Sequence, residues 1–211
     1  MTRAYQRKLR LAETHLQTAC PTLEAWIEIH GKCELKPDWE RETYEALVRA
    51  VAHQQLHGKA AESILSRLTG RFPEQPFPTP KQLSRLRMES YRTCGFSEAK
   101  ALAIIGIAKA QERGKIPSRA DSATMTDDVL ISSLRHLRGI GRWTVEMFLI
   151  FTLGRLDVMP VDDFGVRSAL MQLYGLPELP KKSEFATYTN SWSPYRSIGA
   201  WYLWRYADSQ K

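Results

Sequence analysis

Apolar residues recur every three or four positions along most of the chain, which is the spacing of one buried face of an α-helix. Strand signals are nearly absent, and no internal repeat or low-complexity tract stands out. The sequence therefore predicts an all-α protein. Helices are predicted over residues 1–18, 22–30, 98–111, 130–137, 143–153 and 194–206. Shorter helical patterns occur at 44–51, 61–68 and 166–170, and a further helix start is predicted near residue 80.

The stretch Leu134–Val145 joins two of these predicted helices through Gly139-Ile140-Gly141. Two glycines around one apolar residue allow a sharp turn and leave backbone N–H groups exposed. These groups lie at the start of the second helix, where the helix dipole favours an anion. A short Gly-x-Gly between helices is more often an ordinary tight turn. Together with the segments described below, however, it predicts a helix-hairpin-helix over about 127–153 that can hold a phosphate without reading base sequence.

A pair of carboxylates, Asp162 and Asp163, follows Pro160 and precedes another helical pattern. One interpretation is structural, with Asp162 as the helix N-cap and Asp163 as an acid in the first turn. The other is functional, with a carboxylate held at a helix start beside the hairpin, where nucleic acid would lie. The local sequence alone leaves both interpretations open.

The composition limits the remaining choices. The chain has 211 residues, 43% of them hydrophobic and 25% charged, which suits one soluble domain or two small lobes sharing a core. A net charge of +7 and a pI near 9.4 favour an anionic partner, although many basic proteins bind none. Cys20, Cys33 and Cys94 are widely spaced, so reduced thiols are expected rather than disulfides or a zinc site. No signal peptide and no apolar run of about 18 residues is found, so membrane insertion is not expected.

Four ordered segments resemble the helix-hairpin-helix DNA glycosylase superfamily, and within it the 3-methyladenine DNA glycosylase II branch. They are His53–Ala61, Cys94–Lys100, the hairpin with the carboxylate pair (Leu137–Thr144 and Met159–Arg167), and Trp192–Ser197. The resemblance implies two helical lobes with the active site in the cleft between them. It also implies a single glycosylase domain over residues 1–211, with no room for an extra N-terminal domain. The implied activity is to flip alkylated purines, such as 3-methyladenine and 7-methylguanine, and to hydrolyse the N-glycosidic bond, leaving an abasic site.

The resemblance also assigns the DNA contacts. Gln55 matches the position that fills the hole left by the flipped base, in the turn Gln55-Leu56-His57, and His57 is expected in the minor groove nearby. Phosphate binding is expected from the backbone N–H groups of Gly139, Gly141 and Thr144. A monovalent cation, Na⁺ or K⁺, is expected at the main-chain carbonyls of Arg135, Leu137 and Ile140.

The base pocket and the catalytic carboxylate follow from the same resemblance. Trp143 and Trp204 are expected to hold the flat cationic base, since an indole face attracts such a ring by about 1–2 kcal/mol when desolvated. Met147, one turn after Trp143, is expected on the same wall, where relatives often have an aromatic residue. Asp163 is expected to stabilise the sugar cation and to orient or deprotonate the attacking water, while Asp162 caps the helix. No cofactor is expected to be required for the chemistry.

Two alternatives to a glycosylase without lyase activity fit the sequence less well. A bifunctional glycosylase/lyase of the endonuclease III kind needs a lysine where this chain has Trp143. Such relatives often carry a four-cysteine iron–sulfur cluster, which three scattered cysteines cannot supply. A non-catalytic helix-hairpin-helix protein that only binds damaged DNA would need neither Asp163 nor the two indoles.

The sequence also suggests a setting for the protein. The expected partner is double-stranded DNA containing alkylated bases, with no membrane partner, bound by a monomeric protein. The expected location is intracellular, in the cytoplasm or nucleoid of a bacterium or in the nucleus of a eukaryote.

Overall fold

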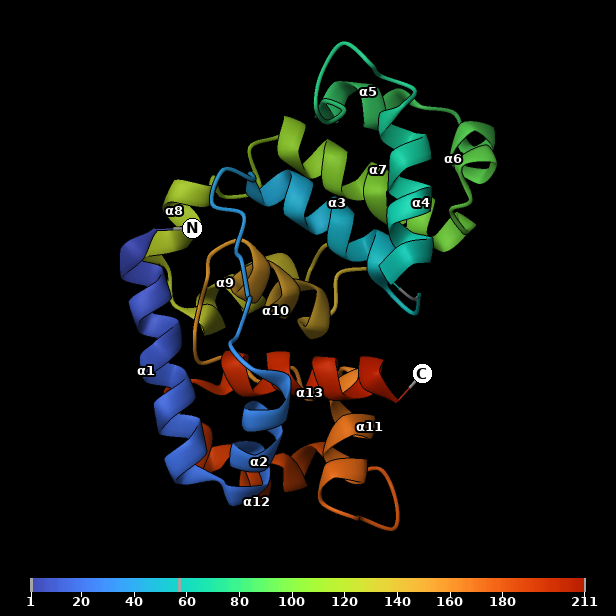
Figure 1. Ribbon diagram of the computed structural model, residues 1–211. Coiled ribbons are helices and arrows are strands. Elements are labelled where there is room, and N and C mark those ends of the chain that lie inside the picture. Colours follow the sequence, from blue (N-terminus) through green and yellow to red (C-terminus); the bar gives the residue numbers. More distant parts are fainter. Residues whose placement is uncertain (1, 57, 211) are drawn as a thin grey trace. The chain divides into compact units, whose positions relative to one another are not determined.

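A computed structural model describes residues 2–56 and 58–210 of the 211-residue chain (Figure 1). Within these residues every regular element is a helix and no strand is found, which confirms the all-α prediction. The helices are α1 (Arg3–Ala19), α2 (Pro21–His30), α3 (Thr43–His53), α4 (Gly58–Thr69), α5 (Pro80–Arg85), α6 (Met88–Cys94), α7 (Glu98–Glu112), α8 (Arg119–Thr124), α9 (Asp127–Leu134), α10 (Arg142–Phe151), α11 (Phe164–Leu173), α12 (Phe185–Thr189) and α13 (Arg196–Ser209), with the 3-10 turns η1 (Lys182–Glu184) and η2 (Asn190–Trp192).

The helices divide into two compact units. The first unit combines the N-terminal residues up to Pro37 with the residues from Gly154 onwards, and the second unit runs from Asp38 to Leu153. Two helical lobes are what the sequence predicts. That both lobes belong to one glycosylase domain, and that a cleft between them holds the active site, stay predictions.

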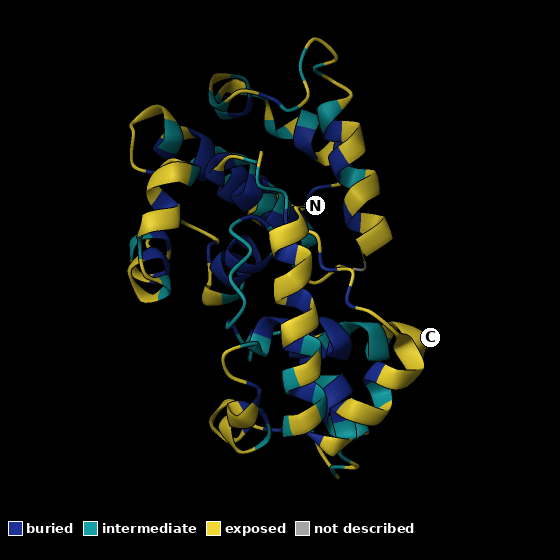
Figure 2. Cartoon of the chain, turned by 60° about the vertical axis from the view of Figure 1, so that its left-hand side comes forward, coloured by how far each residue is buried: buried dark blue, intermediate teal, exposed yellow. Residues whose placement is uncertain are grey.

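The second unit is built around α3, which packs against α4, α7 and α10. Its apolar positions, including Leu47, Val48 and Val51, are fully buried, as their spacing predicts. The neighbouring α7 is capped by the preceding residue, Ser97, whose side chain accepts a hydrogen bond from the Lys100 N–H. Figure 2 shows the same division on many helices, with buried residues on one side and exposed residues on the other.

The first unit is built around α13, which packs against α1, α2 and α11. The expected apolar stripe of α13 is buried, with Tyr202 fully buried and Trp201 9% exposed. Two polar groups of this region are satisfied inside the core. The Trp26 indole donates to the Tyr202 carbonyl at 3.0 Å, and the Tyr202 hydroxyl donates to the Gly31 carbonyl at 2.9 Å.

The longer helices lie where the apolar spacing predicts them, whereas α6, α8, α12 and the 3-10 turns are not among the predicted elements. These elements have three to seven residues, too few for a repeating apolar face to stand out. Several helix ends also differ from the prediction, and one of them lies at the hairpin. The helix predicted to reach Leu137 ends at Leu134, because the chain tightens there into a turn in which the Leu137 N–H donates to the Leu134 carbonyl. None of the described helices is both long enough and apolar enough to cross a lipid bilayer.

Candidate functional site

Residues 135–141 form the hairpin between α9 and α10. The chain reverses through two short backbone bonds of 3.1 Å each, from the Leu137 N–H to Leu134 and from the Ile140 N–H to Leu137. The Ile140 side chain is 5% exposed and anchors the turn, while Gly139 and Gly141 lie at the surface. Gly141 is the N-cap residue of α10, so the exposed backbone lies at the positive end of a helix dipole. The hairpin therefore has the form of an anion-binding helix start.

Gly139 can only be a glycine here, for two independent reasons. Its φ of +78° is in the left-handed region, which residues with a Cβ rarely adopt. A Cβ at this position would also lie 2.6 Å from the Cβ of Ala103 on α7. The hairpin backbone is thus seated directly on α7, and a side chain at Gly139 would push the two apart.

The turn that follows α3, residues 53–56, holds Gln55, the predicted wedge that would fill the hole left by the flipped base. We call it the wedge turn. Gln54 has φ −51° and ψ 126°, Gln55 has φ +55°, and the Leu56 N–H donates to the His53 carbonyl at 3.2 Å. These values describe a type II turn with Gln55 at its third position, where a non-glycine residue is strained. Gln55 is exposed and Leu56 is 40% exposed, while His57 lies outside the described residues. The exposed corner of this turn suits a wedge, and that role stays a prediction.

Gln54 points inward from the same turn, and sequence reasoning gave it no role. Its side-chain amide donates to the Gly139 carbonyl at 2.9 Å and to the Thr144 hydroxyl at 3.0 Å. Thr144 is 1% exposed, and its own N–H donates to the Gly141 carbonyl at 3.1 Å. Thr144 therefore already has partners for its N–H and its hydroxyl, and its predicted phosphate contact stays a prediction.

Asp163, not Asp162, caps α11, which corrects the sequence interpretation. An Asp163 carboxylate oxygen accepts the Val166 N–H at 2.9 Å. The helix starts one residue later than predicted, because a turn closed by the Asp163 N–H and the Pro160 carbonyl at 3.0 Å precedes it. Asp162 instead forms an ion pair with Lys182.

The same oxygen of Asp163 accepts a second hydrogen bond, from the indole N–H of Trp204 at 3.0 Å. The structure thus brings together two of the predicted site residues that are 41 positions apart in the chain. Gly165 lies beneath the pair, since a Cβ there would be 3.2 Å from Asp163 Oδ1 and 3.5 Å from Trp204 Cδ1. The carboxylate is consequently held from two directions, by a helix N-terminus and by an indole.

A cluster of hydrogen bonds, which we call the Asp157–Arg196 clasp, joins the segment that leads to Asp163 to the start of α13. Asp157 accepts two bonds from the Arg196 guanidinium, at 2.7 and 2.8 Å, and one from the Ser193 hydroxyl at 2.9 Å. The buried Ser197 hydroxyl accepts the Val158 N–H at 2.9 Å. Partial burial works to raise the pKa of Asp157, but the hydrogen bonds from Arg196 and Ser193 hold that pKa below its ordinary value. Three of these residues belong to the Trp192–Ser197 segment, whose part in the site the sequence did not specify.

The other predicted pocket residues lie on α10 of the second unit. Trp143 is half-buried, and Met147 is 9% exposed. Between them lies Glu146, a fully buried acid that sequence reasoning missed, and its carboxylate accepts a hydrogen bond from Arg142 Nε at 2.8 Å. The available signal was one acidic residue within a mostly apolar helix. That Trp143 and Met147 share a pocket with Trp204 stays a prediction.

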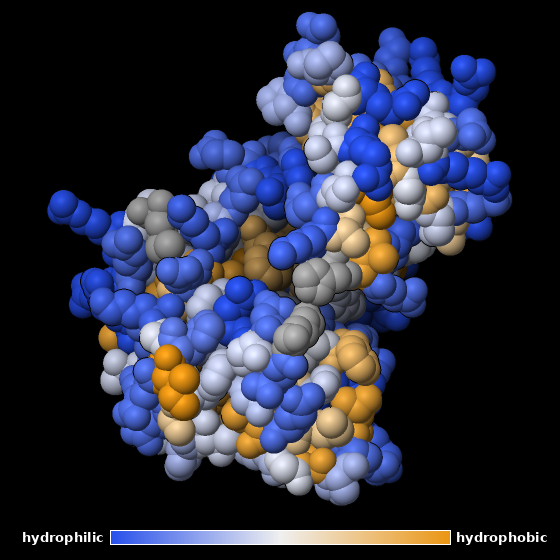
Figure 3. Space-filling model, turned by 45° about the vertical axis from the view of Figure 1, so that its right-hand side comes forward, coloured by the Kyte–Doolittle hydropathy of each residue, from blue (hydrophilic) through white to orange (hydrophobic). Residues whose placement is uncertain are grey.

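Exposed apolar side chains are few in the described residues. The surface in Figure 3 is mostly hydrophilic, with small separate apolar patches. Phe164 is the notable case, because it is 71% exposed and directly follows Asp163. An aromatic ring left in solvent next to the candidate catalytic carboxylate makes Phe164 a further candidate for contact with nucleic acid.

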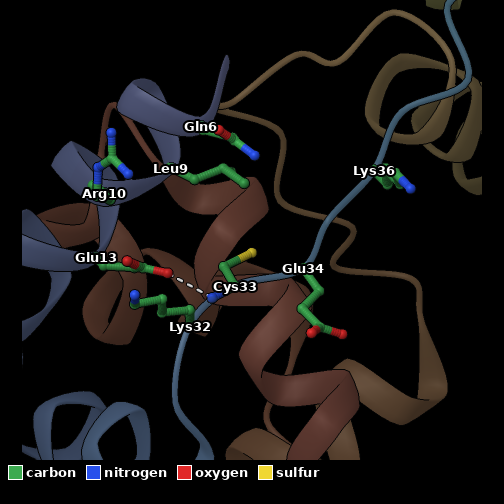
Figure 4. A pocket seen from close by; sticks show the side chains of 8 residues that line it. All are labelled: Gln6, Leu9, Arg10, Glu13, Lys32, Cys33, Glu34 and Lys36. Carbon is green, nitrogen blue, oxygen red and sulfur yellow. Dashed lines mark hydrogen bonds between the residues drawn. The ribbon is translucent and has the colours of Figure 1, made fainter. Parts of the chain in front are cut away.

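A separate hollow of about 470 Å³ lies in the first unit, between α1 and residues 32–36 (Figure 4). It contains none of the predicted site residues, and its charged lining is of mixed sign. Burial raises the pKa of the Cys33 thiol there to about 12, so the thiol stays protonated at neutral pH. Within the described chain, no group of three or more His, Cys, Asp or Glu side chains could hold a metal ion. The predicted site residues lie elsewhere, at the hairpin, in the turn after α3, on α10 and at the Asp163–Trp204 pair.

Comparison with known proteins identifies similar proteins of one kind, DNA repair glycosylases. The family described as "HhH-GPD superfamily base excision DNA repair protein" matches residues 48–194. DNA-3-methyladenine glycosylase 1 of Schizosaccharomyces pombe is 39% identical over 198 residues, which cover 93% of this chain and 87% of that protein. Alkylbase DNA glycosidase-like protein mag2 of the same organism is 37% identical over 195 residues, covering 92% of each chain. The solved structure of the S. pombe 3-methyladenine DNA glycosylase in complex with abasic DNA is similar to this one, with a TM-score of 0.86 and 38% identity, covering 92% of this chain and 95% of that chain.

Proposed function

The chain belongs to the HhH-GPD superfamily of base excision DNA repair proteins, and on that basis we propose that it is a monofunctional glycosylase that removes alkylated purines from DNA. The family membership agrees with the resemblance seen in the sequence. The observation that carries the proposal is the pairing of Asp163 with Trp204, at 3.0 Å. A protein that only bound phosphates would need neither a fixed carboxylate nor an indole beside it. The names of the similar S. pombe proteins support the same substrate class.

In the proposed reaction, breaking the glycosidic bond moves the positive charge from the alkylated base to the sugar. The flipped base leaves with the bonding electron pair, which neutralises the positive charge that alkylation gave it. The sugar carbon left behind becomes cationic, and the Asp163 carboxylate stabilises that charge. Water then adds to this carbon and passes a proton to the Asp163 carboxylate, which releases it to solvent, so the product is an abasic site. The bonds from Val166 and Trp204 leave the carboxylate little freedom to turn away, which reduces the reorganisation required in the transition state.

The proposed partner is double-stranded DNA containing an alkylated base, bound by a monomer inside the cell. The hairpin would hold a phosphate with the backbone N–H groups of Gly139 and Gly141. A monovalent cation, Na⁺ or K⁺, is proposed at the carbonyls of Arg135, Leu137 and Ile140. Carbonyl oxygens suit such a hard ion, and the Leu137 oxygen, which accepts the Ile140 N–H, has a second lone pair to offer. The ion would add positive charge near the phosphate, and the chemistry itself needs no cofactor.

Base release from methylated duplex DNA tests the proposed function. The protein should release 3-methyladenine and 7-methylguanine and leave an abasic strand that breaks only on later alkali treatment. Borohydride should trap no covalent complex, because Trp143 occupies the position of a Schiff-base lysine. Binding to abasic DNA without any base release would instead identify a damage-binding protein. Trapping that depends on Lys59 or Lys100 would identify a bifunctional enzyme.

The wedge assignment of Gln55 predicts a selective loss of affinity. Gln55→Gly should weaken binding to abasic DNA by about tenfold and binding to intact duplex by less than about twofold, since the wedge acts only where a base has left the stack. Glycine is the informative replacement, because it adopts the positive φ of this position without strain. Fluorescence anisotropy with two duplexes that differ only at the abasic position measures both affinities. Equal losses on the two duplexes would show that Gln55 is a general DNA contact.

A further inference from the structure

We propose that Gln54 is a positioning residue that fixes the wedge turn to the hairpin, so that wedge insertion and phosphate binding are coupled. This inference rests on the proposed function, because it assigns the Gln54 side chain a part in damage recognition. Its basis is the pair of hydrogen bonds from the Gln54 amide to the Gly139 carbonyl and the Thr144 hydroxyl, at 2.9 and 3.0 Å. All three residues lie in the second unit.

The partners of Gln54 require an amide nitrogen at this position. The Gly139 carbonyl can only accept a hydrogen bond, so the Gln54 amide must present its NH₂ group to it. Both N–H groups of that NH₂ are then used, one on the hairpin backbone and one on the first turn of α10. A carboxylate at residue 54 would place negative charge against the carbonyl oxygen, and an apolar side chain would leave both acceptors without this donor.

α7 supplies a common support for the two elements that Gln54 joins. The Lys100 ammonium group donates to the carbonyl of Ala52, in the last turn of α3, at 2.9 Å. One turn further along α7, Ala103 lies directly against Gly139, where no Cβ would fit. The end of α3 and the hairpin therefore both pack on α7. Gln54 links these two elements directly, so that α3, α7 and the hairpin form a closed triangle of contacts.

The closed triangle explains how the strained wedge residue is held in place. Gln55 has a φ of +55°, and such a conformation persists in a residue with a side chain only when its surroundings impose it. Gln54 is the residue immediately before it, and both of its amide N–H groups are anchored on the hairpin side. When the hairpin binds phosphates, the fixed turn then holds Gln55 in position for insertion into the duplex. A loose turn would let Gln55 move out of the duplex.

The test is a double-mutant cycle on DNA binding. Gln54→Met keeps the length of the side chain and removes both hydrogen bonds. It should weaken binding to abasic duplex by about five- to tenfold and leave binding to intact duplex within about twofold. The double variant of Gln54→Met with Gln55→Gly should bind abasic DNA no more weakly than Gln55→Gly alone, because Gln54 acts through the wedge. Gln172→Met is the matched control, since it also removes a glutamine side-chain bond, to Ser168, and should have no effect.

Two results would overturn the proposal. Equal losses on both duplexes would show that Gln54 only supports the fold or the hairpin, and additive losses in the double variant would show that it acts independently of Gln55. Base release by the unmutated protein, measured in parallel, distinguishes failure of this inference from failure of the proposed function.

Gln54→Glu serves as a second variant if Gln54→Met does not fold. Relative to the unmutated protein at each pH, its abasic-DNA affinity should be low near neutrality and recover in part towards about pH 5. Protonation there restores one donor for the Gly139 carbonyl. Absence of this recovery would contradict the proposed contact.

Discussion

Replacing Asp163 with asparagine should abolish base excision and leave the fold and the DNA affinity almost unchanged. Asparagine is nearly the same size, caps helices as well as aspartate, and keeps an oxygen that can accept from Val166 and Trp204. Only the negative charge is lost. Since that charge stabilises the developing sugar cation, single-turnover release of 3-methyladenine should fall by about 10²-fold or more. Abasic-DNA affinity and the thermal midpoint, measured on the same preparation, should change little.

The adjacent carboxylate supplies the control for this variant. Asp162→Asn removes an ion pair with the exposed Lys182 side chain, and such surface pairs contribute about 0–1 kcal/mol. Excision should therefore be retained. Asp163→Ala should also lose the helix cap and so lower the free energy of unfolding by about 1 kcal/mol, which Asp163→Asn should not. Equal loss of excision at the two positions would mean that the carboxylates have been assigned the wrong way round.

The cap of α11 illustrates what a local pattern leaves undecided. Two adjacent acids before a helix satisfy the same capping preference, and the sequence interpretation chose Asp162. The choice depends on the turn at Pro160, which delays the helix by one residue, and on Trp204, which approaches from a distant helix. Amphipathic spacing predicted the long helices because their buried faces repeat over several turns. It carries no information about which of two neighbouring side chains a distant element will contact.

Gln54 and Glu146 show the same limit at the predicted DNA-binding elements. Nothing around Gln54 indicates that it turns inward while Gln55 turns outward, because the difference follows from the φ of +55° at Gln55 and from the seating of the hairpin on α7. Glu146 is buried in a mostly apolar helix, and only the structure shows that the exposed Arg142 side chain pairs with it. The Asp157–Arg196 clasp likewise joins residues 39 positions apart. The sequence therefore indicates the residues that match family motifs, but not the residues that hold them in position through contacts with distant parts of the chain.

Substrate choice should follow from the absence of a proton donor among the residues assigned to the base. A neutral purine is a poor leaving group and needs a proton as the bond breaks, and a positioned acid typically contributes about 10²–10⁴-fold. An N3- or N7-alkylated purine already carries a positive charge and departs without one. Glu146 is the acid nearest in sequence to the predicted pocket residues Trp143 and Met147. Its carboxylate already accepts a hydrogen bond from the Arg142 guanidinium at 2.8 Å, and no part in proton transfer is assigned to it.

Release of 3-methyladenine and 7-methylguanine should therefore exceed release of hypoxanthine by about 10²-fold or more, and undamaged bases should be nearly inert. Single-turnover rates on duplexes that differ only in the target base measure the ratio directly. Comparable rates for hypoxanthine and 3-methyladenine would mean that the pocket contains an acid. In that case Glu146→Gln identifies or eliminates the buried carboxylate. If it were the donor, the substitution would remove hypoxanthine release selectively, because the alkylated bases would still depart without a proton.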